Sequence, residues 1–140
     1  EQVILAIVVT TGIASIFLTK DYTPDYNSGL AHAIFYALTS YPVIEKNHLH
    51  GEVVGFGVLL ALLVDEQDEE FEKRYQLNKS ISLPVSLDEI EISKEQWEES
   101  TDRIPDMSDV AHYPYKVTKE MLKNAMARLE ERVRKDNHVR

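Results

Sequence analysis

The stretch "AHAIFYALTSYPVIEKNHLHGEVVGFGVLLALLV" (residues 31–64) decides the fold. Its second half, residues 51–64, is apolar on every side of a helix, which is typical of a central helix in a bundle. We expect residues 53–64 to be the most buried part of the protein. Residues 29–39 predict another apolar helix, and a connection that contains Pro42 joins the two. This arrangement predicts two antiparallel helices whose connected ends lie close together.

The N-terminal run is the next strongest apolar signal. Residues 3–18 contain no charged side chain, but a membrane-spanning helix needs about 20 apolar residues. This run is shorter, and it contains two Thr, a Gly and a Ser. No basic region precedes it, so it does not have the pattern of a secretory signal. We expect a helix over residues 2–18 that is buried on most sides inside the bundle, and no membrane partner.

Helical patterns continue after residue 64. A charged helix is predicted to continue directly from residue 65, with Phe71 and Tyr75 four residues apart on one face. Ser93 and Gln96 have the spacing of a capping box, and Thr118 is placed to cap a last helix. The apolar stripe of that last helix consists of Met121, Leu122, Ala125, Met126, Leu129 and Val133. No stretch alternates as a strand does, so the predicted fold is an all-α bundle of about six or seven helices.

Composition excludes several classes of partner. The chain has 140 residues, is 44% hydrophobic and carries a formal net charge of −9. These values predict one helical domain over residues 1–140 and argue against nucleic acid as a partner, because binding to phosphates needs a basic surface. The absence of cysteine excludes disulfides and thiolate metal sites. It fits a reducing compartment, and we expect a cytoplasmic protein.

Two histidines are candidate metal ligands. His32 and His50 are eighteen residues apart, with His32 about one turn into the first of these two apolar helices and His50 at the start of the second. Neutral imidazole binds zinc or iron. The alternative is a packed core histidine and a capping histidine with no ligand. His48 is expected to face away from this pair. Gly55 and Gly57 interrupt an otherwise bulky helix, which indicates close packing against a flat neighbour.

The segments around these histidines resemble a known family. "SGLAHAIFYALT" (28–39) followed by "LHGEVVGFG" (49–57) resembles the iron-containing alcohol dehydrogenase superfamily, and within it the glycerol dehydrogenase branch. Two later segments are similar as well, "SLPVSLDEI" (82–90) and "AHYPYKVTKEML" (111–122). The likeness keeps its order and spacing from about residue 27 to the last helix. Only the histidine pair with its His-Gly-Glu element is a fairly specific motif.

The resemblance implies a function. In that family an N-terminal domain binds NAD(P), and a helical C-terminal domain supplies an aspartate and two histidines to a divalent zinc or iron ion. The two family histidines match His32 and His50. The metal polarises the substrate hydroxyl for hydride transfer to the nicotinamide. We therefore expect the metal- and substrate-binding domain of an NAD(P)-dependent polyol or alcohol dehydrogenase, with a small polyol or alcohol as substrate.

The chain also departs from the family pattern. The family aspartate lies too far upstream to fall within the 31 residues before His32, and Asp25 and Glu52 are less suitable substitutes. We expect the C-terminal part of a longer protein, inactive by itself. Phe35 and Tyr36 stand where related branches carry a further histidine. Tyr36 is the candidate catalytic residue, as a hydrogen-bond or proton donor, although a tyrosine with a pKa near 10 is a poor base.

These departures leave a second interpretation open. The chain is then a non-catalytic helical module or a degenerate relative, in which the histidines are merely packed. A metal bound by the histidine pair is the property that separates the two interpretations. An apolar N-terminal helix without a covering domain favours self-association, so a homo-oligomer is among the expected assemblies.

Overall fold

The structure is a computed structural model that describes the backbone of residues 2–21 and 29–138 and the side chains of residues 2–13 and 29–138. Within these residues it contains α-helices, three short 3₁₀ turns and no strand. The seven α-helices are α1 (Gln2–Asp21), α2 (Leu30–Leu38), α3 (Pro42–Asn47), α4 (His50–Val64), α5 (Asp68–Ser80), α6 (Lys94–Arg103) and α7 (Lys119–His138). The prediction of an all-α bundle of six or seven helices is confirmed.

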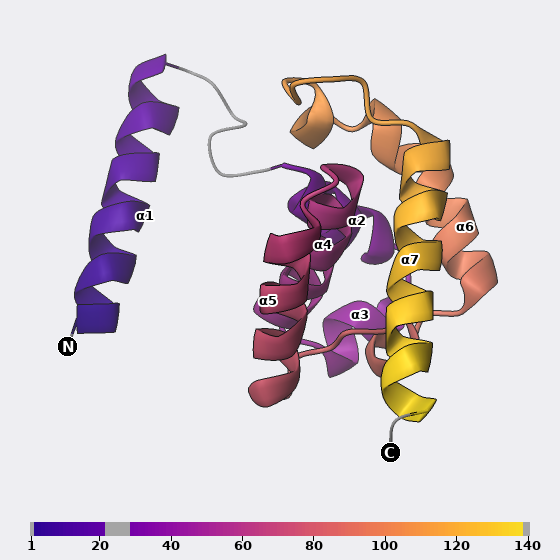
Figure 1. Ribbon diagram of the computed structural model, residues 1–140. Helices are drawn as coiled ribbons and strands as arrows, with labels where there is room; N and C mark the ends of the chain where they lie inside the picture. Colours follow the sequence, from indigo (N-terminus) through magenta and orange to yellow (C-terminus); the bar gives the residue numbers. More distant parts are fainter. Residues whose placement is uncertain (1, 22–28, 139–140) are drawn as a thin grey trace.

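Helix α4 is the centre of the bundle (Figure 1). It packs against α2, α5 and α7, and no residue from 53 to 64 is exposed. Helix α4 carries apolar side chains on all sides because other helices pack around it. The expected central position of residues 53–64 is confirmed.

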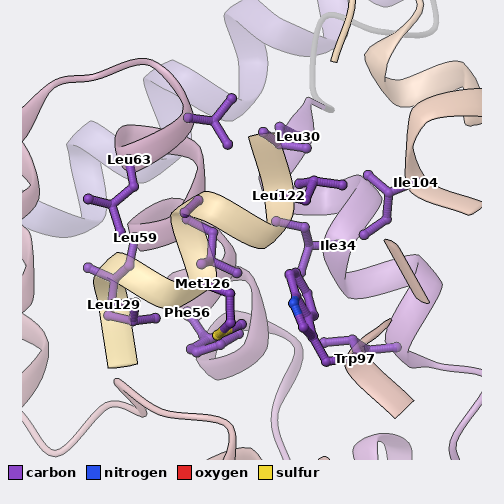
Figure 2. Close-up of a cluster of buried hydrophobic side chains, with 14 of the residues drawn as sticks. Leu30, Ile34, Phe56, Leu59, Leu63, Trp97, Ile104, Leu122, Met126 and Leu129 are labelled. Carbon is purple, nitrogen blue, oxygen red and sulfur yellow. The ribbon is translucent and has the colours of Figure 1, made fainter. Parts of the chain in front are cut away.

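A single hydrophobic core joins α2, α4, α6 and α7. Figure 2 shows Leu30 and Ile34 of α2 lying near Leu122 of α7, with Phe56 of α4 facing Met126. The stripe predicted for the last helix lies on this core, with Leu122, Ala125, Met126 and Leu129 buried and Met121 and Val133 partly buried. Trp97 of α6 is only 3% exposed and anchors its helix in the same cluster.

Helix α1 contradicts the expected burial of the N-terminal run. The side chains of residues 2–13 are all exposed, and the large apolar ones among them are between 48% and 71% exposed. Figure 1 shows α1 standing beside the bundle rather than inside it. The prediction was wrong because an uncharged helix is buried only where other elements surround it, and no helix in the described residues covers residues 2–13. Among the described residues, no helix meets the length and hydrophobicity needed to cross a membrane.

Two helix boundaries also differ from the expectation. The connection between the first apolar helices contains α3, whose first residue is Pro42, a position that tolerates proline because its missing N–H would be unpaired anyway. The charged helix does not continue from α4, since Glu66 adopts a left-handed conformation with φ 57°. The Gln67 N–H then donates to the Leu62 carbonyl at 2.9 Å, as in a helix C-terminal turn.

The predicted caps are present at the later helices. The Gln96 N–H donates to the Ser93 hydroxyl at 3.2 Å, and the Ser93 N–H donates to the Gln96 side-chain oxygen at 2.8 Å. This reciprocal pair is a capping box at the start of α6. The Met121 N–H donates to the Thr118 hydroxyl at 3.2 Å at the start of α7. Phe71 and Tyr75 are both buried on one face of α5, with ring centroids 5.9 Å apart.

Candidate metal centre

The two candidate ligands lie side by side. His32 is in the first turn of α2, and His50 is the first residue of α4. Their ring centroids are 5.5 Å apart, and the rings are tilted by 44°. Residues eighteen positions apart in the sequence are thus brought into contact by the packing of α2 on α4. The two rings share one surface region rather than separate packing environments.

A glycine allows the close approach of α2 and α4. A Cβ atom on Gly57 would lie 2.7 Å from the Ala31 carbonyl oxygen, which is closer than real Cβ atoms come, and 3.0 Å from the Ala31 Cα, which is tighter than most Cβ contacts. Gly57 therefore meets the backbone of the residue that precedes His32. Gly55 differs, because its Cβ would make an ordinary 3.6 Å contact with the Leu83 side chain. The predicted close packing is confirmed for Gly57 and involves the helix that carries His32.

Two arginines secure the C-terminal ends of the helices that carry the histidines. Arg103 donates to the Ala37 carbonyl at 3.1 Å and to the Ser40 hydroxyl at 2.7 Å, at the end of α2. Arg128 donates to the Leu63 carbonyl at 3.2 Å, at the end of α4. The last carbonyls of a helix lack partners within the helix, so these contacts satisfy them and complement the helix dipole.

Electrostatics favour the neutral form of His32. Burial lowers the pKa of His32 below its ordinary value of 6.5, the neighbouring His50 lowers it further, and Asp109 opposes the shift. Neutral imidazole is the form that binds a metal ion. Asp109 belongs to the 3₁₀ turn Ser108–Val110, which packs on α2. Sequence reasoning missed Asp109, because its position near His32 depends on the path of the long segment between α6 and α7.

A third ligand is missing from the described part of the chain. No group of three His, Cys, Asp or Glu side chains in these residues is arranged to hold a metal ion. Of the two substitutes considered, Asp25 lies outside the described residues. The Glu52 carboxylate accepts a hydrogen bond from the Leu49 N–H at 2.8 Å and lies 3.9 Å from the imidazole of His48. The donor set here consists of two imidazoles, whereas catalytic zinc sites take three protein ligands.

Aromatic rings border the histidine pair. The Phe35 ring meets the His50 ring edge to face at a centroid distance of 4.4 Å, as a packing aromatic does. The Tyr36 ring centroid lies 6.4 Å from that of His32, and Tyr36 is 46% exposed. The catalytic role of Tyr36 stays a prediction.

His48 is directed to a different set of groups. Its Nε2 lies 3.2 Å from a Glu91 carboxylate oxygen, and its Nδ1 lies 3.9 Å from a Glu52 oxygen. The expectation that His48 takes no part in the histidine pair agrees with these contacts. Its side chain is nonetheless only 10% exposed, a burial that its place in a polar connection does not predict.

One solved structure has a similar fold over most of this chain. It is a probable glycerol dehydrogenase from Sinorhizobium meliloti 1021, with 24% sequence identity and a TM-score of 0.62. The match covers 76% of this chain and 31% of that chain. This chain is similar in fold to part of that protein. No protein-family model matches the sequence, and neither does any curated protein.

The similarity to the Sinorhizobium protein concerns the fold and not the chemistry of the site. This chain spans about a third of the length of the Sinorhizobium protein. At this level of identity the likeness concerns the arrangement of helices. The candidate metal centre is therefore defined by the two histidine side chains and by their sequence context.

Proposed function

We propose that this chain is the metal- and substrate-binding helical domain of an NAD(P)-dependent polyol or alcohol dehydrogenase. The observation that carries the proposal is the contact between His32 and His50, with ring centroids 5.5 Å apart. The same eighteen-residue spacing and His-Gly-Glu element carried the resemblance to glycerol dehydrogenases. A fold similar to part of a probable glycerol dehydrogenase adds independent support.

The residues present fit two of the ligand positions of a divalent zinc or iron ion. His32 and His50 would hold the ion, and the lowered pKa of His32 keeps its nitrogen available near neutral pH. When bound, the ion supplies Lewis-acid polarisation of a substrate hydroxyl. The third ligand comes from outside the residues described here, in keeping with the aspartate that the family resemblance implies.

The chain's own side chains supply positioning around that centre. The Phe35 ring packs edge to face on the His50 ring at a centroid distance of 4.4 Å and helps to fix its position. Tyr36 places an exposed phenol beside His32, where its hydroxyl is available to donate a hydrogen bond to a bound alcohol. The nucleotide cofactor is bound by a separate domain under this proposal, so the 140-residue chain alone should not oxidise glycerol or related diols with NAD(P).

The alternative is a helical module without catalysis. Two observations favour it: the absence of a third ligand from the described residues and the packing of Phe35 on His50. Under this alternative the two imidazoles are ordinary packed side chains. Removing them would then change stability without changing metal binding.

Metal binding by histidine variants tests the proposal. We expect zinc to shift the imidazole ¹⁵N resonances of His32 and His50 in the chain, weakly because two ligands hold less firmly than three. His32→Ala and His50→Ala should each abolish the response at the other histidine. His138→Ala is the matched control, since His138 lies exposed at the end of α7. Zinc responses that persist in both variants, or that are equal at His138, would contradict the proposal.

A further inference from the structure

Two tyrosines tie the segment between α6 and α7 to the end of α4. The Tyr113 hydroxyl donates to Asp65 Oδ1 at 2.8 Å, and the Tyr115 hydroxyl donates to the same oxygen. The two phenol rings meet edge to face at a centroid distance of 5.1 Å. We propose that Asp65 is the latch of a strap, residues 107–117, and that this latch positions Asp109 beside His32. Figure 1 shows the strap, in orange, at the top of the bundle.

The position of Asp65 in its helix calls for an explanation. Asp65 is the C-cap of α4, and a carboxylate is unfavourable there because the helix dipole favours a cation at this end. Two phenol donors offset that cost, since hydrogen bonds to an ionised acceptor are stronger than neutral ones. Burial, and then the hydrogen bond to Asp65, raise the pKa of Tyr113 above its ordinary value of 10 and that of Tyr115 to about 12. Both phenols therefore remain donors at physiological pH.

A continuous set of contacts leads from Asp65 to the helix that carries His32. The Tyr113 N–H donates to the Val110 carbonyl at 3.1 Å. The Val110 side chain is buried, and it belongs to the 3₁₀ turn that packs on α2. Asp109 lies in the middle of that turn and acts electrostatically on His32. The latch is thus linked to the surroundings of His32 through hydrogen bonds and one buried side chain.

Apolar burial holds only the ends of the strap. No side chain of residues 111–116 is buried, whereas Val110 and Val117 on either side of them are. A segment with few buried apolar contacts opens locally at a low cost in free energy. The hydrogen bonds between the two phenols and Asp65 therefore set how often the strap opens. No metal ion takes part in these contacts, so the latch is tested independently of the metal proposal.

Hydrogen exchange of the strap amides tests the latch. The Ala111 and Tyr113 amides are hydrogen-bonded within the strap, at 3.1 Å each. Asp65→Asn removes the charge that both phenols contact, so exchange at these two amides should become about tenfold faster, the effect of losing one charge-assisted hydrogen bond. Glu66→Gln is the matched control, because it removes the charge of the next residue, and it should leave both rates unchanged. Unchanged rates in Asp65→Asn, or equal acceleration in the control, would overturn the proposal.

A tyrosine titration separates loss of the latch from a general loosening of the loop. In Asp65→Asn the pKa of Tyr115 should fall from about 12 toward 10, as followed by its ring ¹³C shifts. Glu66→Gln should lower that pKa less, because Glu66 contributes less to it than Asp65 does. An unchanged pKa in Asp65→Asn would show that the Tyr115 hydroxyl is not bound to Asp65 in solution.

A double-mutant cycle tests whether the latch reaches His32. At about pH 8, where His32 is neutral, Asp65→Asn should shift the ring resonances of His32, because Asp109 moves away from the ring. The same substitution in an Asp109→Asn background should give no further shift, since the two changes remove one interaction. Equal shifts in both backgrounds, or no shift in either, would show that Asp65 does not position Asp109.

Discussion

Helices α1 and α4 are both strongly apolar, but they differ in solvent exposure. Both are apolar on all sides over most of their length, yet residues 53–64 of α4 contain no exposed side chain, whereas residues 2–13 of α1 are all exposed. The difference lies in their neighbours, because α4 is surrounded by α2, α5 and α7. A helix that is apolar on all sides is stabilised by neighbours that cover it. Its sequence does not show whether other helices of the same chain are those neighbours.

The first test compares one leucine from each helix. Leu59→Ala in α4 should lower the free energy of unfolding by about 2–5 kcal/mol, because it leaves a cavity in the core. Leu5→Ala in α1 should cost less than about 0.5 kcal/mol, as exposed substitutions do. Urea unfolding of both variants measures the two costs.

A large cost for Leu5→Ala would break the comparison. It would mean that α1 is covered in solution, and a homo-oligomer is the expected way to cover it. Sedimentation at several protein concentrations separates the cases. If the protein is a monomer at every concentration, α1 is exposed in solution. If a dimer forms at high concentration and the Leu5→Ala variant does not form it, α1 lies in the dimer interface.

The second test compares glycines within the same two helices. Gly57→Ala should destabilise the protein by about 1–3 kcal/mol, because the new methyl group overlaps the Ala31 backbone and forces α2 away from α4. Gly12→Ala in α1 has open space around it and should be neutral or favourable, by up to about 1 kcal/mol of helix propensity. Urea unfolding measures both. The Gly57 variant should also lose NMR contacts between the His32 and His50 rings, and their retention would show that Gly57 does not set that geometry.

The third test has the smallest expected effect on stability. It concerns the polar contacts between α5 and α7, two helices that pack on α4. Arg132 of α7 donates to both oxygens of Glu72 of α5, at 2.8 and 2.7 Å. These hydrogen bonds lower the pKa of Glu72 from 4.5 to about 2. A carboxyl group with a lowered pKa in the folded state stabilises the fold above its unfolded pKa, and this contribution is lost as the pH falls from about 4.5 toward 2.

Thermal unfolding across this pH range measures that contribution. Glu72→Gln should be less stable than the wild type at pH 7 by under about 1 kcal/mol, since the pair is partly exposed to solvent. The difference should close as the pH approaches 2. Glu69→Gln, an exposed change on the same helix, is the control and should show no such pH-dependent difference. A constant difference at every pH would mean that packing rather than charge explains the effect.

Much of the fold follows from local patterns. The capping box at Ser93, the cap at Thr118 and the paired aromatics Phe71 and Tyr75 were predicted and are present. These features depend on residues within four positions of one another, so a single sequence contains the information. The helix α3 and the break at Glu66 were missed, because short turns are decided by how the flanking helices dock.

The candidate site was also predictable in part from the sequence and in part only from the structure. The sequence by itself determined which side chains are candidate ligands, His32 and His50, and that a glycine in the central helix meets a close neighbour. Only the tertiary structure decided that the two rings lie 5.5 Å apart, that Asp109 acts on His32 and that His48 is buried beside Glu91. It also left α1 exposed. The physical reason is that periodicity and capping are properties of neighbouring residues, whereas burial, charge environment and side-chain contact depend on segments that meet only after the helices pack.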